Sequence, residues 1–112
     1  MRQVRSWGDW IAAYYKEKTQ TTVTNIVWSN GALDPWSGGG QYDTRTAAGG
    51  ITGPLVQNLT EDGSTVALAI ALAGHHLDLY FPTAGDPPTV VEARRVEAEM
   101  IRRWCQAHYD EL

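Results

Sequence analysis

The sequence predicts an α/β fold in which two parallel strands precede a C-terminal helix, and three segments support this prediction. Residues 66–73, V-A-L-A-I-A-L-A, are apolar without alternation. Residues 24–30 form a shorter run rich in β-branched side chains that ends at the turn signal Asn30-Gly31. Residues 89–108 repeat apolar side chains at steps of three or four. Continuous apolar runs are typical of parallel strands that are buried on both faces.

Each predicted element has its own justification. The helix over 89–108 is preceded by Asp86 and two prolines, and Thr89 with Glu92 fits a capping box. Its apolar stripe consists of Ala93, Val96, Met100, Trp104 and Ala107. A buried helix stays open as an alternative for 66–73, because alanine is frequent there. Residues 38–63 are expected to form a loop with at most one turn of structure. The aromatic segment 1–20 is expected to be a short helix or an irregular packing segment.

Composition limits the classes of function. The 112 residues carry a net charge of -4, which gives no basic surface for nucleic acid. No apolar run approaches the ~18 residues that cross a bilayer, and residues 1–7 lack the apolar core of a secretory signal. The single cysteine, Cys105, excludes an internal disulfide but could pair with a segment outside this chain.

Two candidate catalytic side chains follow the two predicted strands. Asp34 lies four residues after Asn30, and His75 lies two residues after Ala73. The carboxyl ends of parallel strands are where open α/β sheets build their sites. α/β-Hydrolases order their triad as Ser, then Asp or Glu, then His. A catalytic pair requires Asp34 and His75 to lie within hydrogen-bonding distance, because a carboxylate orients the imidazole that takes the proton of a nucleophilic serine. The spacing alone also allows Asp34-Pro35 to be an ordinary turn and His75 to be a surface or core residue.

Other residues near this pair allow more than one role. The H-H-x-D run of residues 75–78 contains three possible metal ligands, yet consecutive side chains of an extended segment point in opposite directions. We therefore expect no metal site, and we expect His76 to point away from Asp34. Trp36 could line an apolar pocket or pack beneath its loop. Asn58-Leu59-Thr60 is a sequon for N-glycosylation.

The sequences of two segments resemble motifs of one family of serine peptidases. Residues 29–40, S-N-G-A-L-D-P-W-S-G-G-G, resemble the acid loop of the family that contains lysosomal Pro-Xaa carboxypeptidase and dipeptidyl peptidase II. Residues 74–79, G-H-H-L-D-L, resemble its histidine loop, and 86–94 resemble the start of its final helix. The chain departs from the family pattern in Ala73-Gly74, where Gly-Ala is usual, and in the long stretch 41–64.

The resemblance carries its own expectations. It implies that residues 1–112 are the C-terminal portion of an α/β-hydrolase peptidase domain, with Asp34 and His75 as two members of the triad. It implies a proline-directed serine exopeptidase, either a carboxypeptidase or a dipeptidyl peptidase, that acts on peptides with proline near the cleaved end. It also implies a lysosomal, vacuolar or secreted glycoprotein modified at Asn58, and we expect no cofactor.

One part of the expected machinery is missing from the sequence. No Gly-x-Ser-x-Gly occurs, so the nucleophilic serine is absent. We therefore expect a piece of a longer enzyme that is inactive alone and depends on the remainder of its hydrolase domain. The alternative is a non-catalytic product that acts only as a structural or binding piece.

Overall fold

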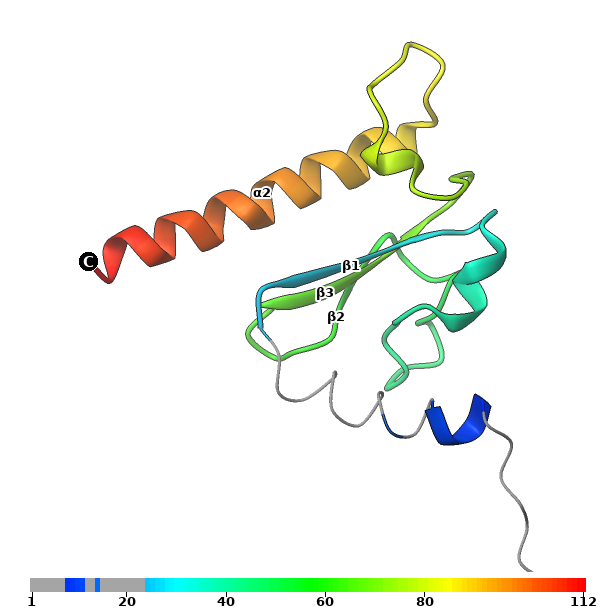
Figure 1. Ribbon diagram of the computed structural model, residues 1–112, viewed down its shortest axis with the longest axis horizontal. Coiled ribbons are helices and arrows are strands. Elements are labelled where there is room, and N and C mark those ends of the chain that lie inside the picture. The colour runs from blue at the N-terminus through cyan, green and yellow to red at the C-terminus, as the bar shows by residue number, and fades with distance from the viewer. Residues whose placement is uncertain (1–7, 12–13, 15–23) are drawn as a thin grey trace, which may run out of the picture.

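The computed structural model describes residues 8–11, 14 and 24–112 of the chain (Figure 1). Of the aromatic segment 1–20, residues 8–11 and 14 are helical, and the rest of the segment lies outside the described residues. Three strands, β1 (Ile26–Gly31), β2 (Val56–Asn58) and β3 (Thr65–Ile70), form one sheet within the described part. A long helix, α2 (Pro88–Asp110), follows them. The elements are therefore of the α/β type that the sequence predicts.

The sheet has the order β1-β3-β2, with β3 in the centre. β1 pairs with β3 in parallel, from Ile26 opposite Thr65 to Gly31 opposite Ile70. This confirms the two predicted adjacent parallel strands. β2 pairs with β3 in antiparallel, with Gln57 opposite Ala67. The sheet is therefore mixed, because β2 extends it on the side away from β1.

Two predictions about chain segments are wrong in part. The strand predicted to reach Ala73 ends at Ile70, because Leu72 has a φ of 61° and turns the chain away from the sheet. The stretch 38–63 predicted as a loop contains the strand β2, whereas the 3₁₀ helix η1 (Pro35–Gly39) lies mostly before this stretch. β2 has only three residues, which is too short to show strand periodicity.

The core lies between β3 and α2. Val66, Leu68 and Ile70 alternate along β3 and form one cluster with the helix residues Val90, Ala93 and Met100. The predicted helical stripe is thus confirmed over most of its length. Its last member, Ala107, is exposed, because the C-terminal end of α2 extends beyond the sheet (Figure 1).

The start of α2 differs from the prediction. Pro87 is the N-cap and makes no side-chain cap, whereas Pro88 occupies the first turn as expected. The capping box is wrong because both of its side chains bond elsewhere. The hydroxyl of Thr89 donates to the Ala71 carbonyl at 2.5 Å, and Glu92 pairs with Arg95 at 2.7 Å. Thr89 thereby joins the helix to the turn after β3.

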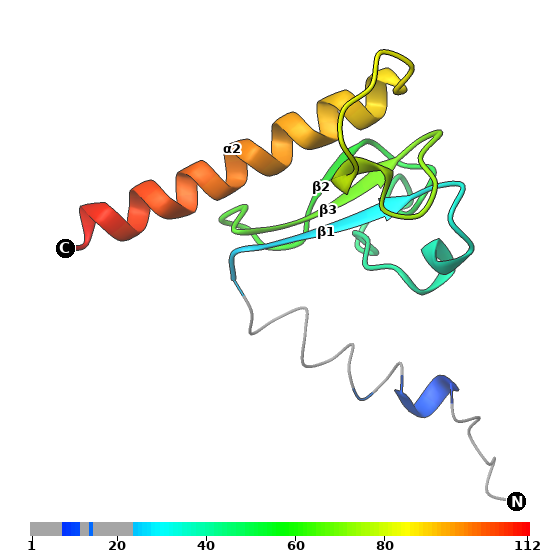
Figure 2. The ribbon, with the colours of Figure 1, turned by 45° about the horizontal axis from the view of Figure 1, so that its top comes forward.

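The second face of the sheet is also covered. Thr65, Ala67 and Ala69 point away from the α2 side of β3 and are at most 4% exposed. Residues 35–55 lie on the opposite side of the sheet from α2 in both views (Figures 1 and 2). β3 is therefore covered on both of its faces. β1 is only half-buried.

None of the described helices is long and apolar enough to cross a membrane.

We predict that the chain alone is insoluble or partly unfolded. Within the described residues β1 pairs on one side only, and large side chains on the loops after β1 and β3 are exposed, including Phe81 at 93% and Trp36 at 77%. Open strand edges and exposed apolar surface favour association. Size-exclusion chromatography with light scattering, followed by thermal unfolding, tests this. A monodisperse monomer of 12.4 kDa with a sharp cooperative transition would contradict it.

Candidate functional site

The loops that follow β1 and β3 are joined by their own backbone. Ala32 N–H donates to the Ile70 carbonyl and Leu33 N–H donates to that of Ala73, both at 2.9 Å. Gly31 allows this approach, because a Cβ there would lie 2.4 Å from the carbonyl oxygen of Gly74. The parallel pairing therefore continues past the strands and delivers both loops to one edge of the sheet.

This continuation brings Asp34 and His75 together. Nδ1 of His75 lies 2.7 Å from Oδ2 of Asp34, so the predicted contact is confirmed. The second oxygen, Oδ1, accepts the Trp36 N–H at 3.0 Å, which makes Asp34 the N-cap of η1. The hydrogen bond from His75, followed by that from Trp36, lowers the pKa of Asp34 and keeps the carboxyl ionised.

The geometry of the pair suits proton transfer. An ionised Asp34 accepts a hydrogen bond from a protonated Nδ1, which leaves Nε2 of a neutral imidazole free to take a proton. The Asp34 side chain is 11% exposed and that of His75 is 57% exposed. The carboxylate is thus largely shielded from water, while the imidazole stays open to another reacting group.

The other residues of the H-H-x-D run face different partners. The ring of His76 lies against that of His75, with centroids 3.8 Å apart, and the imidazole bonded to Asp34 is that of His75. Asp78 is 5% exposed, and it accepts the hydroxyl of Ser29 at 2.5 Å. Asp78 therefore ties the histidine loop to β1.

Each residue of the S-N-G run before Asp34 has a structural task. Ser29 bonds Asp78, and Gly31 permits the close approach of the histidine loop. The side-chain amide of Asn30 lies 3.1–3.2 Å from the carbonyls of Trp28, Gln41 and Leu68, and so fixes the return of the acid loop. A Cβ at Gly40 would lie 2.2 Å from Oδ1 of Asn30, which explains the last glycine of the G-G-G run.

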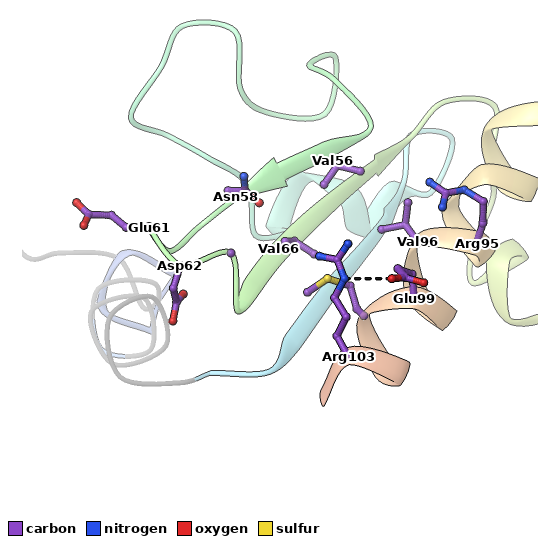
Figure 3. A pocket seen from close by; sticks show the side chains of 11 residues that line it. Val56, Asn58, Glu61, Asp62, Val66, Arg95, Val96, Glu99 and Arg103 are labelled. Atoms are coloured by element: carbon purple, nitrogen blue, oxygen red, sulfur yellow. Dashed lines mark hydrogen bonds and ion pairs between the residues drawn. The ribbon is translucent and has the colours of Figure 1, made fainter. Parts of the chain in front are cut away.

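Trp36 and Asn58 lie in different parts of the molecule. Trp36 is exposed beside Asp34, so its indole is available for contact at the site. Asn58 is exposed on β2 and lines a cavity of about 410 Å³ between the β2–β3 hairpin and α2 (Figure 3). The same cavity is lined by Arg103, which pairs with Glu99 at 3.1 Å. It is separate from the Asp34–His75 pair.

Sequence reasoning missed one group, Glu97 on α2. Burial, followed by the Asp78 carboxyl beside it, raises the pKa of Glu97 to about 7, although Ser29 and Arg94 lower it in part. These four residues come from β1, the 3₁₀ helix η2 (Leu77–Leu79) and α2. The only signal in the sequence is a glutamate on the helix, next to the apolar stripe.

Comparison with known proteins gives a consistent result. The model of the serine carboxypeptidase S28 family matches residues 1–97. The lysosomal Pro-X carboxypeptidases of Homo sapiens and Pongo abelii are each 37% identical over 107 residues, which is 96% of this chain and 18% of the relative. The prolyl carboxy peptidase like protein 5 of Caenorhabditis elegans is 34% identical over 76% of this chain and 14% of that protein. The chain thus spans less than a fifth of these relatives.

We predict that Glu97 makes the fold more stable in acid than at neutral pH. Its pKa is raised from 4.5 to about 7, so its contribution to stability is fully present below pH 4.5 and is lost as the pH rises towards 7. Glu97→Gln should flatten this part of the profile. Fluorescence-detected unfolding of the longer protein that contains this chain, between pH 4 and 8, measures it, with Glu111→Gln at the exposed end of α2 as the control. Equal slopes for wild type and Glu97→Gln would contradict the assignment.

Proposed function

Because the chain belongs to the serine carboxypeptidase S28 family, we propose that it is the C-terminal portion of a proline-directed serine exopeptidase with an α/β-hydrolase fold. In this proposal residues 1–112 form one part of a hydrolase domain. Asp34 is the triad acid and His75 is the triad base. The observation that carries the proposal is the 2.7 Å contact between Oδ2 of Asp34 and Nδ1 of His75.

The proposed chemistry follows from that contact. Nε2 of His75 takes the hydroxyl proton of a serine supplied by the longer protein, and the serine oxygen attacks the peptide carbonyl. Asp34 holds the imidazole in the required tautomer and stabilises the imidazolium that forms. His75 then gives the proton to the leaving amine. In the second half of the reaction His75 takes a proton from water, the water oxygen attacks the acyl carbonyl, and His75 returns the proton to the serine oxygen as it leaves.

The substrate preference rests on the relatives and on Trp36. The mammalian relatives are named as Pro-X carboxypeptidases, and we propose that this enzyme also acts on peptides with proline near the cleaved end. An exposed indole next to the acid could pack on a proline ring, because both surfaces are flat and apolar. Removal of a C-terminal residue and removal of an N-terminal dipeptide are both consistent with these groups.

The location follows from the same relatives. Three mammalian relatives are named as lysosomal, so we propose a lysosomal, vacuolar or secreted protein. The sequon at Asn58 would then be exposed to the glycosylation machinery.

The first test concerns activity. We predict that the 112-residue chain does not cleave a proline-containing chromogenic peptide, because it lacks the nucleophile elbow. In a longer protein that includes an upstream Gly-x-Ser-x-Gly, His75→Ala should lower kcat by about 10⁶-fold and Asp34→Asn by about 10⁴-fold. His108→Ala, on the exposed end of α2, is the matched control.

Two results would overturn this proposal. One is turnover by the purified chain that His75→Ala abolishes, because the chain would then contain a complete site. The other is full activity of His75→Ala in the longer protein. A search of the same locus for an in-frame Gly-x-Ser-x-Gly is the least costly first step, and its absence would favour the non-catalytic alternative.

A second test concerns the sequon. Asn58 is exposed, and the Thr60 hydroxyl accepts the Thr65 N–H at 3.1 Å, so the sequon lies in an ordered hairpin. We predict that secretion from a eukaryotic host attaches one glycan that Asn58→Gln and Thr60→Ala both remove. Intact mass measurement before and after enzymatic deglycosylation shows this. A secreted wild-type protein with unmodified Asn58 would contradict it.

A further inference from the structure

The loop that carries His75 has little support of its own. It runs from Gly74 to Pro87, between β3 and α2, and η2 is the helical turn within it. The side chains of Leu79, Tyr80 and Phe81 are exposed. Such a segment needs contacts from other elements to hold one conformation.

The backbone next to His75 is also strained. His76 has a φ of 53° and lies in the left-handed region, which costs a non-glycine residue free energy. Leu72, with a φ of 61°, lies before His75 on the other side. Strained residues persist only where the surrounding structure fixes them. Side chains from neighbouring elements must therefore hold this conformation.

Arg94 on α2 is one of them. Its Nε donates to the Asp78 carbonyl at 2.9 Å, and Nη2 donates to those of Leu77 at 2.9 Å and Tyr80 at 3.2 Å. Its Nη1 donates to Oδ2 of Asp86 at 2.6 Å. A single guanidinium, 17% exposed, thus binds the turn just after His75 and the end of the same loop.

Asp86 is a fixed partner for this guanidinium. Its carboxylate accepts the N–H and the hydroxyl of Thr83 at 3.0 Å and 2.8 Å. These bonds and Arg94 lower the pKa of Asp86 to about 2, so the carboxylate is ionised at any pH at which a peptidase works. A charge-assisted pair that is 17% and 7% exposed is a stronger link than a surface ion pair.

Ser29 provides a second link from the opposite side. Its hydroxyl donates to Oδ2 of the buried Asp78, and Ser29 belongs to β1, the strand that leads to Asp34. The strand that presents the acid is therefore bonded to the turn that follows the base. Any shift of this turn relative to β1 would change the position of His75 relative to Asp34.

We propose that Arg94 and Ser29 are positioning residues that hold residues 74–80 so that His75 faces Asp34. They act through the backbone and through Asp78. This inference rests on the proposed function, since it assigns a purpose to the placement of a catalytic histidine. A displacement of about 1 Å at such a group can lower kcat by about 10²-fold.

The test uses the same longer peptidase as the proposed His75→Ala experiment, with His75→Ala measured beside the new variants. Arg94→Met and Arg94→Lys should each lower kcat by about 10²-fold and leave KM nearly unchanged, because the ammonium of lysine cannot bind three carbonyls in the fixed geometry of a guanidinium. The low-field NMR signal of the His75 Nδ1 proton, which reports its bond to Asp34, should weaken. Arg95→Met is the matched control, since Arg95 is the next residue on α2 and is 65% exposed in a pair with Glu92.

Thermal unfolding of every variant separates positioning from stability. If both Arg94 variants fail to fold, Ser29→Ala decides, with a loss of about tenfold in kcat expected at unchanged KM. Folded variants with wild-type kcat and an intact Nδ1 signal would overturn the inference while His75→Ala remains inactive. Activity of His75→Ala would instead overturn the proposed function itself.

Discussion

The parallel pairing of β1 with β3 places two loops at the same edge of the sheet, and the candidate site depends on this register. Two backbone hydrogen bonds extend the pairing beyond the strands, and Gly31 removes the side chain that would keep the loops apart. Asp34 then meets His75 at this edge, with Oδ2 of Asp34 bonded to Nδ1 of His75. A shift of the register by one residue would invert the faces of β3 and separate the pair.

The rest of the structure supports this edge from two sides. The core between β3 and α2 fixes the distance between the sheet and the helix. At this distance the side chain of Arg94 reaches the histidine loop and donates to the Leu77 carbonyl. Residues 35–55 return across the other face and are held by Asn30. Hydrophobic burial therefore fixes the frame, and a few directional hydrogen bonds fix the loops on it.

Within the described residues, some surfaces of the sheet and its loops are not covered. β1 is half-buried and forms an edge of the described sheet, whereas β3 is covered on both faces. Exposed aromatic and aliphatic side chains gather on the loops around the Asp34–His75 pair. In the longer peptidase that we propose, additional parts of the hydrolase domain would cover these surfaces, and the chain spans under a fifth of its relatives. This arrangement agrees with the proposal that the nucleophile comes from elsewhere in a longer protein.

The sequence alone predicted the two parallel strands from their continuous apolar runs and the helix from its apolar stripe, because both patterns are local properties that survive in the fold. It predicted the meeting of Asp34 with His75 from their positions after the strands together with the resemblance of residues 29–40 and 74–79 to the loops of a peptidase family. It did not predict β2, since three residues have no clear period, nor the true start of α2, since Thr89 found a partner on Ala71. Only the tertiary structure decided the roles of Arg94, Asp78 and Glu97. Their partners lie on β1, on the histidine loop and on α2, and contacts between segments so far apart in sequence arise only when the chain packs.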